Sequence, residues 1–179
     1  MTIDYRDITL SYATTTFAEA TINNGSLPTT SVVTLAGDVF NASVANAATF
    51  TSGTHFTVAN IPTGLTAVIT KDSSTTATVS FTGTATDNLL NPADVTNFTI
   101  TWLNAAFTAA PAANITNYAK SDFTLDFLNQ ASLAYAGNFT ETSVNNGAVS
   151  GTRTATLTGD TFQDTDADNI LDIGTEVIL

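Results

Sequence analysis

The stretch LTAVITKDSSTTATVSF, residues 65–81, decides the fold class of this chain. One face of each half is apolar: Leu65, Ala67 and Ile69 in the first half, and Ala77, Val79 and Phe81 in the second. A period of two residues is typical of a strand with one buried face, and the polar run 71–74 separates the two halves. The stretch therefore predicts a β-hairpin.

The same alternation recurs along the chain. Residues 98–102 and 123–127 each place apolar side chains at every second position, and shorter strands are expected at 8–12, 32–35 and 56–58. Asn-Gly and Pro-containing turns separate these segments, and almost no 3.6-residue period occurs. The pattern predicts an all-β fold, an antiparallel immunoglobulin-like β-sandwich. For residues 103–119, Pro111 and several asparagines favour a loop or an edge strand over a short helix.

Residues 132–162 repeat residues 9–40. Leu133 lies 123 residues after Leu10, and Phe162 lies 122 residues after Phe40, so one insertion or deletion separates the copies. The shared positions are Leu10/Leu133, Tyr12/Tyr135, Phe17/Phe139, Glu19/Glu141, Asn23/Asn145, Asn24/Asn146, Gly25/Gly147, Leu35/Leu157, Gly37/Gly159, Asp38/Asp160 and Phe40/Phe162. A period near 122 residues is close to the size of one globular domain. It predicts one complete module at 7–129, followed at 130–179 by the first part of a second.

A module that stops after about 50 residues leaves an apolar face and sheet edges uncovered. It can dock on the first module, pair with another chain or continue in a longer parent protein, and we expect the last. The start MTIDYRDITL lacks the basic and apolar regions of a signal peptide, so a signal for export would lie upstream. No apolar run is long enough to span a bilayer.

The composition argues against nucleic acid and acidic membranes as partners. The net charge is −12, and four Lys or Arg residues are too few to neutralise a phosphate backbone. Threonine is the commonest residue, charged residues make up 11% and cysteine is absent. Thr-rich, acidic and Cys-free chains are common among large bacterial surface proteins, so we expect a secreted or cell-surface location.

Residues 53–83, GTHFTVANIPTGLTAVITKDSSTTATVSFTG, together with the L-x-Y…F-T-E-x-x-x-N-N-G pattern of 133–147, resemble the tandem β-sandwich repeats of giant bacterial surface adhesins. The resemblance covers nearly the whole chain. It implies a row of sandwich modules that serves as a stalk or adhesive rod, often stiffened by calcium. It implies no particular ligand for this module.

One acidic segment carries possible metal chemistry. Asp164, Asp166, Asp168 and Asp172 occupy positions 1, 3, 5 and 9 of a D-x-D-x-D calcium loop, and Ile170 would offer its backbone carbonyl at position 7. Asn169 takes the place of the usual Gly at position 6, because Asn tolerates a positive φ.

The loop departs from the usual pattern at position 12. Thr175 stands there and Glu176 follows one residue later, so either the loop is one residue longer or another group, such as Asp160, completes the ligands. A solvated acidic loop is the alternative. Calcium is favoured because four carboxylates within nine residues repel one another unless a cation neutralises them. The equivalent stretch of the first copy, 41–49, has no carboxylate, so we expect one Ca²⁺ site, in the second copy only.

Other candidate residues favour structural roles. His55 has no nucleophile motif beside it, and we expect a surface or half-buried position. Trp102 lies on an apolar face and is expected in the core. Glu19 and Glu141 occupy equivalent places in the two copies, and we expect each to pair with a loop or to complete a turn near its Asn-Asn-Gly.

The sequence therefore predicts a non-catalytic structural or adhesive module, whose partners are adjacent repeats or neighbouring copies, with a surface glycan or protein as a possible ligand. Two alternatives stay open. One is a carbohydrate-binding accessory module with an aromatic platform. The other is a filament subunit whose incomplete sandwich is completed by a neighbour's strand.

Overall fold

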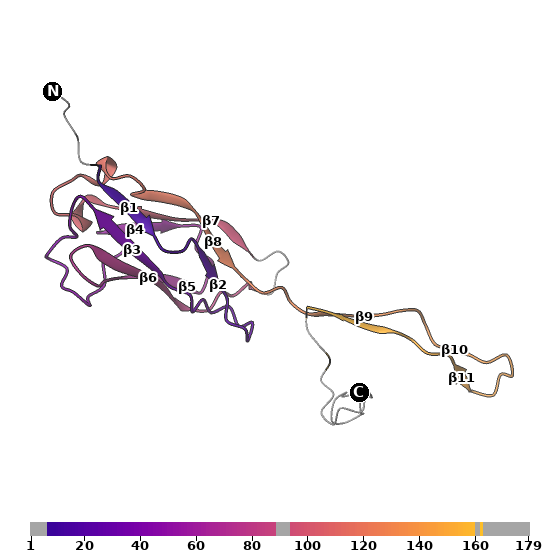
Figure 1. The fold of residues 1–179 in the computed structure, drawn as a ribbon. Helices are drawn as coiled ribbons and strands as arrows, with labels where there is room; N and C mark the ends of the chain where they lie inside the picture. Colours follow the sequence, from indigo (N-terminus) through magenta and orange to yellow (C-terminus); the bar gives the residue numbers. More distant parts are fainter. Residues whose placement is uncertain (1–6, 89–93, 160–161, 163–179) are drawn as a thin grey trace. The chain divides into compact units, whose positions relative to one another are not determined.

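The computed structural model describes residues 7–88, 94–159 and 162. The chain divides into two compact units, Met1–Asn129 and Gln130–Leu179, called unit 1 and unit 2 below. Figure 1 shows the course of the chain through both.

Unit 1 is a sandwich of two four-stranded sheets. The first sheet has the order β1-β3-β6-β5, with bounds Thr9–Tyr12, Ser31–Ala36, Thr76–Gly83 and Leu65–Lys71. The second has the order β2-β8-β7-β4, with bounds Thr16–Ala18, Ala119–Asp126, Val95–Trp102 and Phe56–Ala59. The all-β sandwich expected from the alternating patterns is confirmed.

The hairpin that opened the sequence analysis forms as predicted. β5 and β6 pair antiparallel from Leu65↔Gly83 to Lys71↔Ala77, and Leu65, Ile69 and Val79 are buried on the inner face. β6 also pairs with β3 on its other edge. The hairpin therefore forms one half of the first sheet, and β3 and β1 form the other half.

The start of the chain joins both sheets. β1 pairs antiparallel with β3, and after a break at residues 13–15 β2 pairs parallel with β8 in the other sheet. The other strand pairs of the two sheets are antiparallel, as expected, and the β2–β8 pair is parallel. The reason is that one chain segment crosses from one sheet to the other and keeps its direction, so it runs beside β8 in the same sense.

The segment after β7 contains two short 3₁₀ turns, η1 (Asn104–Ala106) and η2 (Ala112–Asn114), before β8 begins at Ala119. Neither the short α-helix nor the edge strand considered for this stretch forms. Pro111 lies directly before η2 with a φ of −59°, a value that its ring imposes. The loop expected from Pro111 is therefore found, with two tight turns inside it.

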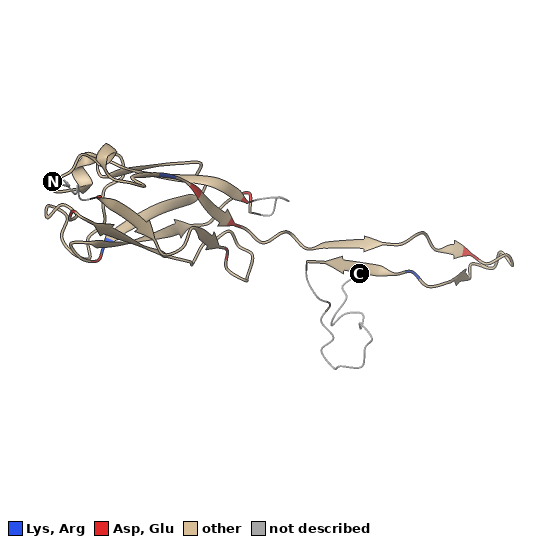
Figure 2. Cartoon of the chain, turned by 45° about the horizontal axis from the view of Figure 1, so that its top comes forward, with Lys and Arg blue, Asp and Glu red and all other residues tan. Residues whose placement is uncertain are grey.

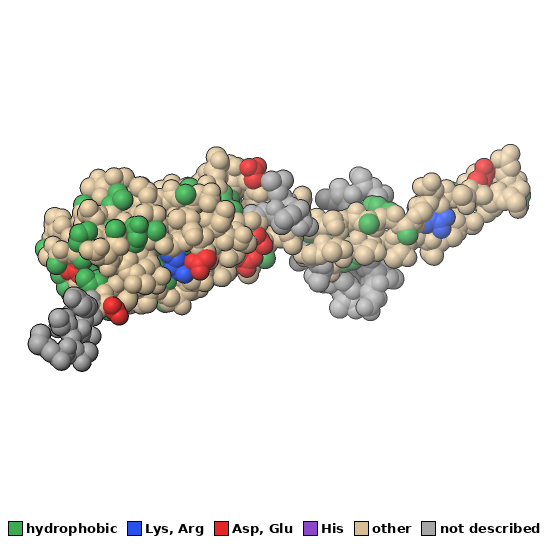
Figure 3. Space-filling model, turned by 90° about the horizontal axis from the view of Figure 1, so that it is seen from above, with side chains coloured by type: hydrophobic (Ala, Val, Ile, Leu, Met, Phe, Trp, Pro, Cys, Tyr) green, Lys and Arg blue, Asp and Glu red, His purple; other side chains and the backbone are tan. Residues whose placement is uncertain are grey.

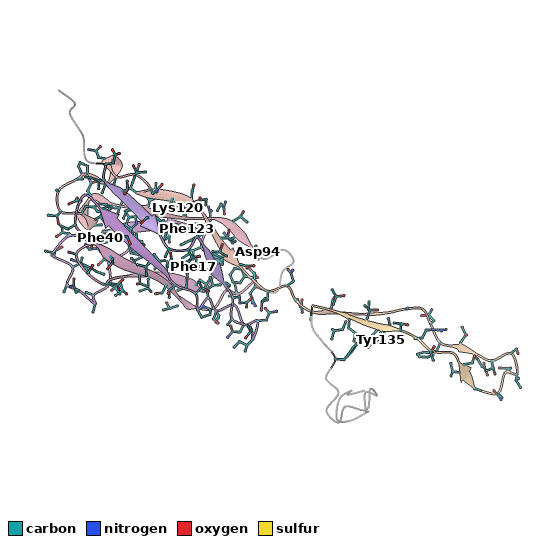
Figure 4. The ribbon with its side chains drawn as sticks, viewed as in Figure 1. Phe17, Phe40, Asp94, Lys120, Phe123 and Tyr135 are labelled. Carbon is teal, nitrogen blue, oxygen red and sulfur yellow. The ribbon has the colours of Figure 1, made fainter. Side chains whose placement is uncertain are left out.

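The core of unit 1 lies between the sheets and is rich in aromatic rings. The largest fully buried side chains are Trp102, Phe17, Phe40, Phe56, Phe98 and Phe123. Figure 4 shows Phe17, Phe40 and Phe123 among the strands of the sandwich. Trp102 is fully buried, as expected, and its ring lies 5.3 Å from that of Phe40 and 5.2 Å from that of Phe50, measured between centroids.

Unit 2, in its described part, consists of two two-stranded ladders. β9 (Ser132–Tyr135) pairs with β12 (Ala155–Thr158), and β10 (Thr140–Glu141) pairs with β11 (Val149–Ser150). The register repeats that of unit 1, since Leu133 opposes Leu157 as Leu10 opposes Leu35. The sequence repeat is therefore also a repeat of strand pairing.

Tyr12 links β1 to the buried tryptophan. Its hydroxyl accepts a hydrogen bond from Trp102 Nε1 (3.0 Å), and its ring meets that of Phe123 edge-on at 5.0 Å. Burial raises the pKa of the Tyr12 phenol far above its ordinary value, and the Trp102 hydrogen bond opposes this shift only in part.

The raised pKa predicts a loss of stability in alkali. An unfolded tyrosine ionises near pH 10, whereas folded Tyr12 keeps its proton, so the contribution of Tyr12 to the free energy of unfolding is constant below about pH 10 and falls above it. Absorbance titration of tyrosinate should show that one of the four tyrosines ionises only as unit 1 unfolds. Tyr12→Phe should remove that late-titrating group, and its persistence in this variant would contradict the assignment.

Candidate functional site

Two carboxylates hold the last residues of unit 1. Glu19, directly after β2, accepts a hydrogen bond through Oε2 from the backbone N–H of Leu128 (2.8 Å). Asp94, directly before β7, accepts one through Oδ1 from the N–H of Phe127 (2.8 Å). Asn23 Nδ2 adds a longer bond to the carbonyl of Asn129 (3.5 Å). We call residues 126–129 the exit segment; Asp94 is labelled near it in Figure 4.

The other oxygen of Glu19 fixes two loops. Oε1 accepts hydrogen bonds from the backbone N–H of Gly25 and from Asn88 Nδ2, the latter at 3.0 Å. Asn88 Nδ2 also donates to Asn23 Oδ1 (3.1 Å). Glu19 is buried, and hydrogen bonds to an ionised carboxylate offset the cost of removing it from water. One side chain thus joins the exit segment, the Asn-Asn-Gly turn and the loop at Asn88.

Unit 2 repeats this turn. Glu141 Oε1 accepts a hydrogen bond from the backbone N–H of Gly147 (2.5 Å), as Glu19 does from Gly25. Asn145 has a φ of 50° and Gly147 of 79°, against 50° and 80° at the equivalent positions of unit 1. The prediction that both glutamates complete a turn at their Asn-Asn-Gly is confirmed. The two turns differ in environment, because Glu19 is buried and Glu141 is exposed.

The left-handed backbone of the turn explains its glycine. Gly25 adopts a φ of 80°, and a Cβ added there would lie 2.5 Å from the carbonyl oxygen of Ala85. At Gly147 a Cβ would meet no atom within 4 Å. The turn therefore forms with the same shape in both units, whereas the close packing against it belongs to unit 1.

The Glu19 contacts predict unequal effects of two equivalent substitutions. Glu19→Ala leaves the N–H groups of Gly25 and Leu128 without their acceptor and removes one acceptor of the Asn88 amide, so unit 1 should lose about 3 kcal/mol of stability. Trp102, the only tryptophan, reports on unit 1 by fluorescence during urea unfolding. Glu141→Ala is the matched control and should leave that curve unchanged. Equal effects of the two would refute the proposed role of Glu19.

Lys71 is a second buried charged residue of unit 1. Lys71 ends β5, and its Nζ donates hydrogen bonds to the carbonyl oxygens of Asn41 (2.9 Å), Val44 (2.9 Å) and Phe40 (3.4 Å). Within the described part of the chain the ion pair is that of Lys120 with Asp122, so the Lys71 ammonium is held by backbone dipoles. The loop after Phe40 therefore surrounds a cation that the chain itself supplies.

Replacement of Lys71 tests this arrangement. Lys71→Met keeps an unbranched apolar stem and removes the ammonium, which leaves three inward carbonyls without it, and unit 1 should lose about 2 kcal/mol of stability. Arg153→Met is the control, because it removes the same charge from unit 2, whereas Trp102 reports on unit 1. Trp102 fluorescence in urea measures both, and a Lys71→Met variant as stable as the parent would contradict the role.

The expected calcium ligands Asp164, Asp166, Asp168, Ile170, Asp172 and Glu176, and also Asp160, lie outside the described residues. Among the residues that are described, no group of three or more His, Asp or Glu side chains is placed to hold a metal ion. Figure 2 shows how sparse charged residues are along the strands of unit 1, and Figure 3 shows few charged side chains on the face that it presents.

Trp102 and His55 do not form an exposed binding platform. The Trp102 side chain is fully buried, so it cannot stack on a sugar ring without a change in the core. Beside it lies an open hollow of about 410 Å³, lined in part by Thr54, Asn104 and Tyr118. His55 is half-buried, as expected, and its Nδ1 accepts a hydrogen bond from the N–H of Thr51 (2.9 Å), which closes the turn before β4.

No family model matches the sequence, and no curated protein matches it. Among solved structures, the chain is similar to the chitinase ChiW of Paenibacillus sp. str. FPU-7, which is described as a bacterial cell-surface-expressed multi-modular enzyme. The match has 19% identity and a TM-score of 0.41, and it covers 67% of this chain and 13% of the chitinase chain. An activity of this chain does not follow from it. In the described residues, no helix has the length and apolar character needed to cross a membrane.

Proposed function

We propose that this chain is a non-catalytic structural or adhesive module of a secreted or cell-surface bacterial protein. The observation that carries the proposal is the repeat of one strand register and one Glu-Asn-Asn-Gly turn in two successive units. Copying of a scaffold along a chain is typical of rods built from modules. The composition and the resemblance to adhesin repeats support the location.

The hydrogen bonds of the exit segment support the proposal that unit 1 bears tension along the chain. Tension applied through the end of unit 1 reaches Phe127 and Leu128, whose N–H groups are bound to Asp94 and Glu19. These bonds join the exit segment to β7 and β2 of the same sheet. The tension is therefore distributed over strands on either side of β8 instead of acting on β8 alone.

Calcium is the second part of the proposal. In unit 1 the carbonyls of Asn41 and Val44, which follow Phe40, accept hydrogen bonds from the Lys71 ammonium. In the equivalent stretch after Phe162 the sequence has Asp164, Asp166 and Asp168. A monovalent internal cation needs only carbonyl dipoles, whereas a free divalent cation needs carboxylates. This comparison supports a loop that holds a cation in both units, with Ca²⁺ bound in the second through Asp164, Asp166, Asp168, Ile170, Asp172 and Glu176.

Isothermal titration of the whole chain with Ca²⁺ should give one site. Asp166→Ala combined with Asp168→Ala should abolish the heat, because it removes two of the carboxylates, while Asp122→Ala should leave it unchanged as a control for net charge. Chelation should raise protease sensitivity at 160–176 and lower the melting temperature of unit 2, since binding and folding are linked. A parent chain that gives no heat would refute the calcium site, and binding without either effect of chelation would refute stiffening.

A further inference from the structure

The hollow beside Trp102 is built from several segments of unit 1. It has a volume of about 410 Å³ and lies where β7 ends, where η1 and η2 turn and where β8 begins. Three alanines line it with short side chains: Ala105 on η1, and Ala112 and Ala113 on η2. Because these side chains are small they leave the space open, and its volume falls within the range of about 300–1,000 Å³ that small-molecule sites occupy.

Hydrogen bonds fix the segments around the hollow. The N–H of Trp102 donates to the carbonyl of Tyr118 (2.8 Å), which holds the end of β7 against the residue before β8. Asn104 Oδ1 accepts a hydrogen bond from the N–H of Ala112 (2.8 Å), which joins η1 to η2. Trp102 and Ala112 are both buried, so they are already packed in the core. The hollow is therefore a preformed surface of the folded unit.

Polar groups without a protein partner line the hollow. Within the described part of the chain Asn104 uses only Oδ1, so its Nδ2 keeps both N–H donors. Tyr118, Thr101 and Thr54 also line the hollow, and their hydroxyls make no hydrogen bond among the described residues. Every buried side-chain nitrogen or oxygen of those residues has a partner, so these free groups reach solvent. A ligand in the hollow can bond to them.

The hollow disfavours charged ligands. All of its lining residues are uncharged, so a phosphate or carboxylate would meet no lysine or arginine there. The net charge of −12 would also repel an acidic ligand. A purely apolar ligand would leave the amide and the hydroxyls unpaired, which costs free energy. The lining therefore fits a neutral ligand with many hydroxyl groups.

A sugar ring has both kinds of surface that the hollow can bind. Its hydroxyls donate and accept hydrogen bonds, which suits the Asn104 amide and the threonine hydroxyls. Its C–H face is apolar and suits the ring of Tyr118, which is half-buried against the core and has a polar tip. Tyr118 can therefore take the role that an exposed Trp102 would have in a sugar-binding platform.

We propose that this hollow binds a neutral hexose unit of a glycan, with Tyr118 against the sugar ring and Asn104 Nδ2 bound to its hydroxyls. A hollow of this size holds about one sugar unit, so the dissociation constant should be in the millimolar range. The proposal rests on the adhesive part of the proposed function only in giving it a ligand. A chain that bound no glycan would lose this site, whereas the calcium loop and the structural role have their own tests.

NMR titration of the nitrogen-15-labelled whole chain tests the proposal. The ligands are the hexasaccharides of cellulose, starch, chitin and mannan, with an oligogalacturonate as the acidic comparison. At least one neutral hexasaccharide should bind and shift the amide signals of Ala105, Ala112 and Ala113, whereas the oligogalacturonate should not. The proposal is overturned if no neutral hexasaccharide binds at millimolar concentration, or if the shifts are confined to residues outside the hollow.

Asn104→Asp removes the donors and keeps the fold. Its carboxylate still accepts the Ala112 N–H, while the two N–H donors are replaced by an oxygen, so sugar binding should weaken roughly tenfold or more. Asn114→Asp is the matched control, because it adds the same charge on η2 at a residue that does not line the hollow. Thermal unfolding followed by Trp102 fluorescence checks that both variants fold. A folded Asn104→Asp variant that binds like the parent would contradict the site.

Tyr118→Leu separates sugar contact from packing. It keeps an apolar side chain against the core and removes the aromatic ring, so binding should be lost while the melting temperature stays close to that of the parent. Tyr135→Leu makes the same change at a tyrosine of unit 2, labelled in Figure 4, and should bind like the parent. Equal affinities of the two variants would overturn the assignment of Tyr118.

Discussion

The constraint on which the rest of the structure depends is that an apolar sheet face must be covered by a second sheet. In unit 1 the aromatic side chains of both sheets meet this condition, with Phe17, Trp102 and Phe123 fully buried between them. Burial of such rings is the largest favourable contribution to folding. Unit 2 pairs β9 with β12 in the register of β1 with β3, yet Phe139, the counterpart of the buried Phe17, is exposed.

The strands and turns that could be predicted from the sequence are those whose signals lie close together in the chain. Alternation over residues 65–81 predicted β5 and β6, and Asn-Gly marked the turns, because both signals lie within a few residues of one another. The parallel pairing of β2 with β8 was not predictable in this way. It joins Phe17 to Leu125 across more than a hundred residues, and the crossing between sheets at 13–15 has no sequence signal of its own.

In the candidate site, too, contacts between nearby residues were predictable from the sequence and contacts between distant residues were not. The contact of Glu19 with Gly25 spans six residues and was expected from the repeat, whereas its contact with Leu128 spans 109 residues and was not. Lys71 was read only as part of a polar turn, because its carbonyl partners near Asn41 and Val44 come from a distant loop. A lysine at the end of an otherwise apolar inner face was the available signal, since a charge there needs a partner.

The comparison of the two units separates local from long-range determinants within one chain. The Glu-Asn-Asn-Gly turn has nearly identical backbone angles whether its glutamate is buried or exposed, so the turn does not require the packing around it. Strands far along the chain bury the side chains around this turn in unit 1. Some of the residues that pack against those strands differ between the two copies. Ser31, buried beside β6, became Arg153, whereas the turn residues were kept. A module of this kind can therefore change the side chains of its interior without losing the local turn and strand pairing that start each repeat.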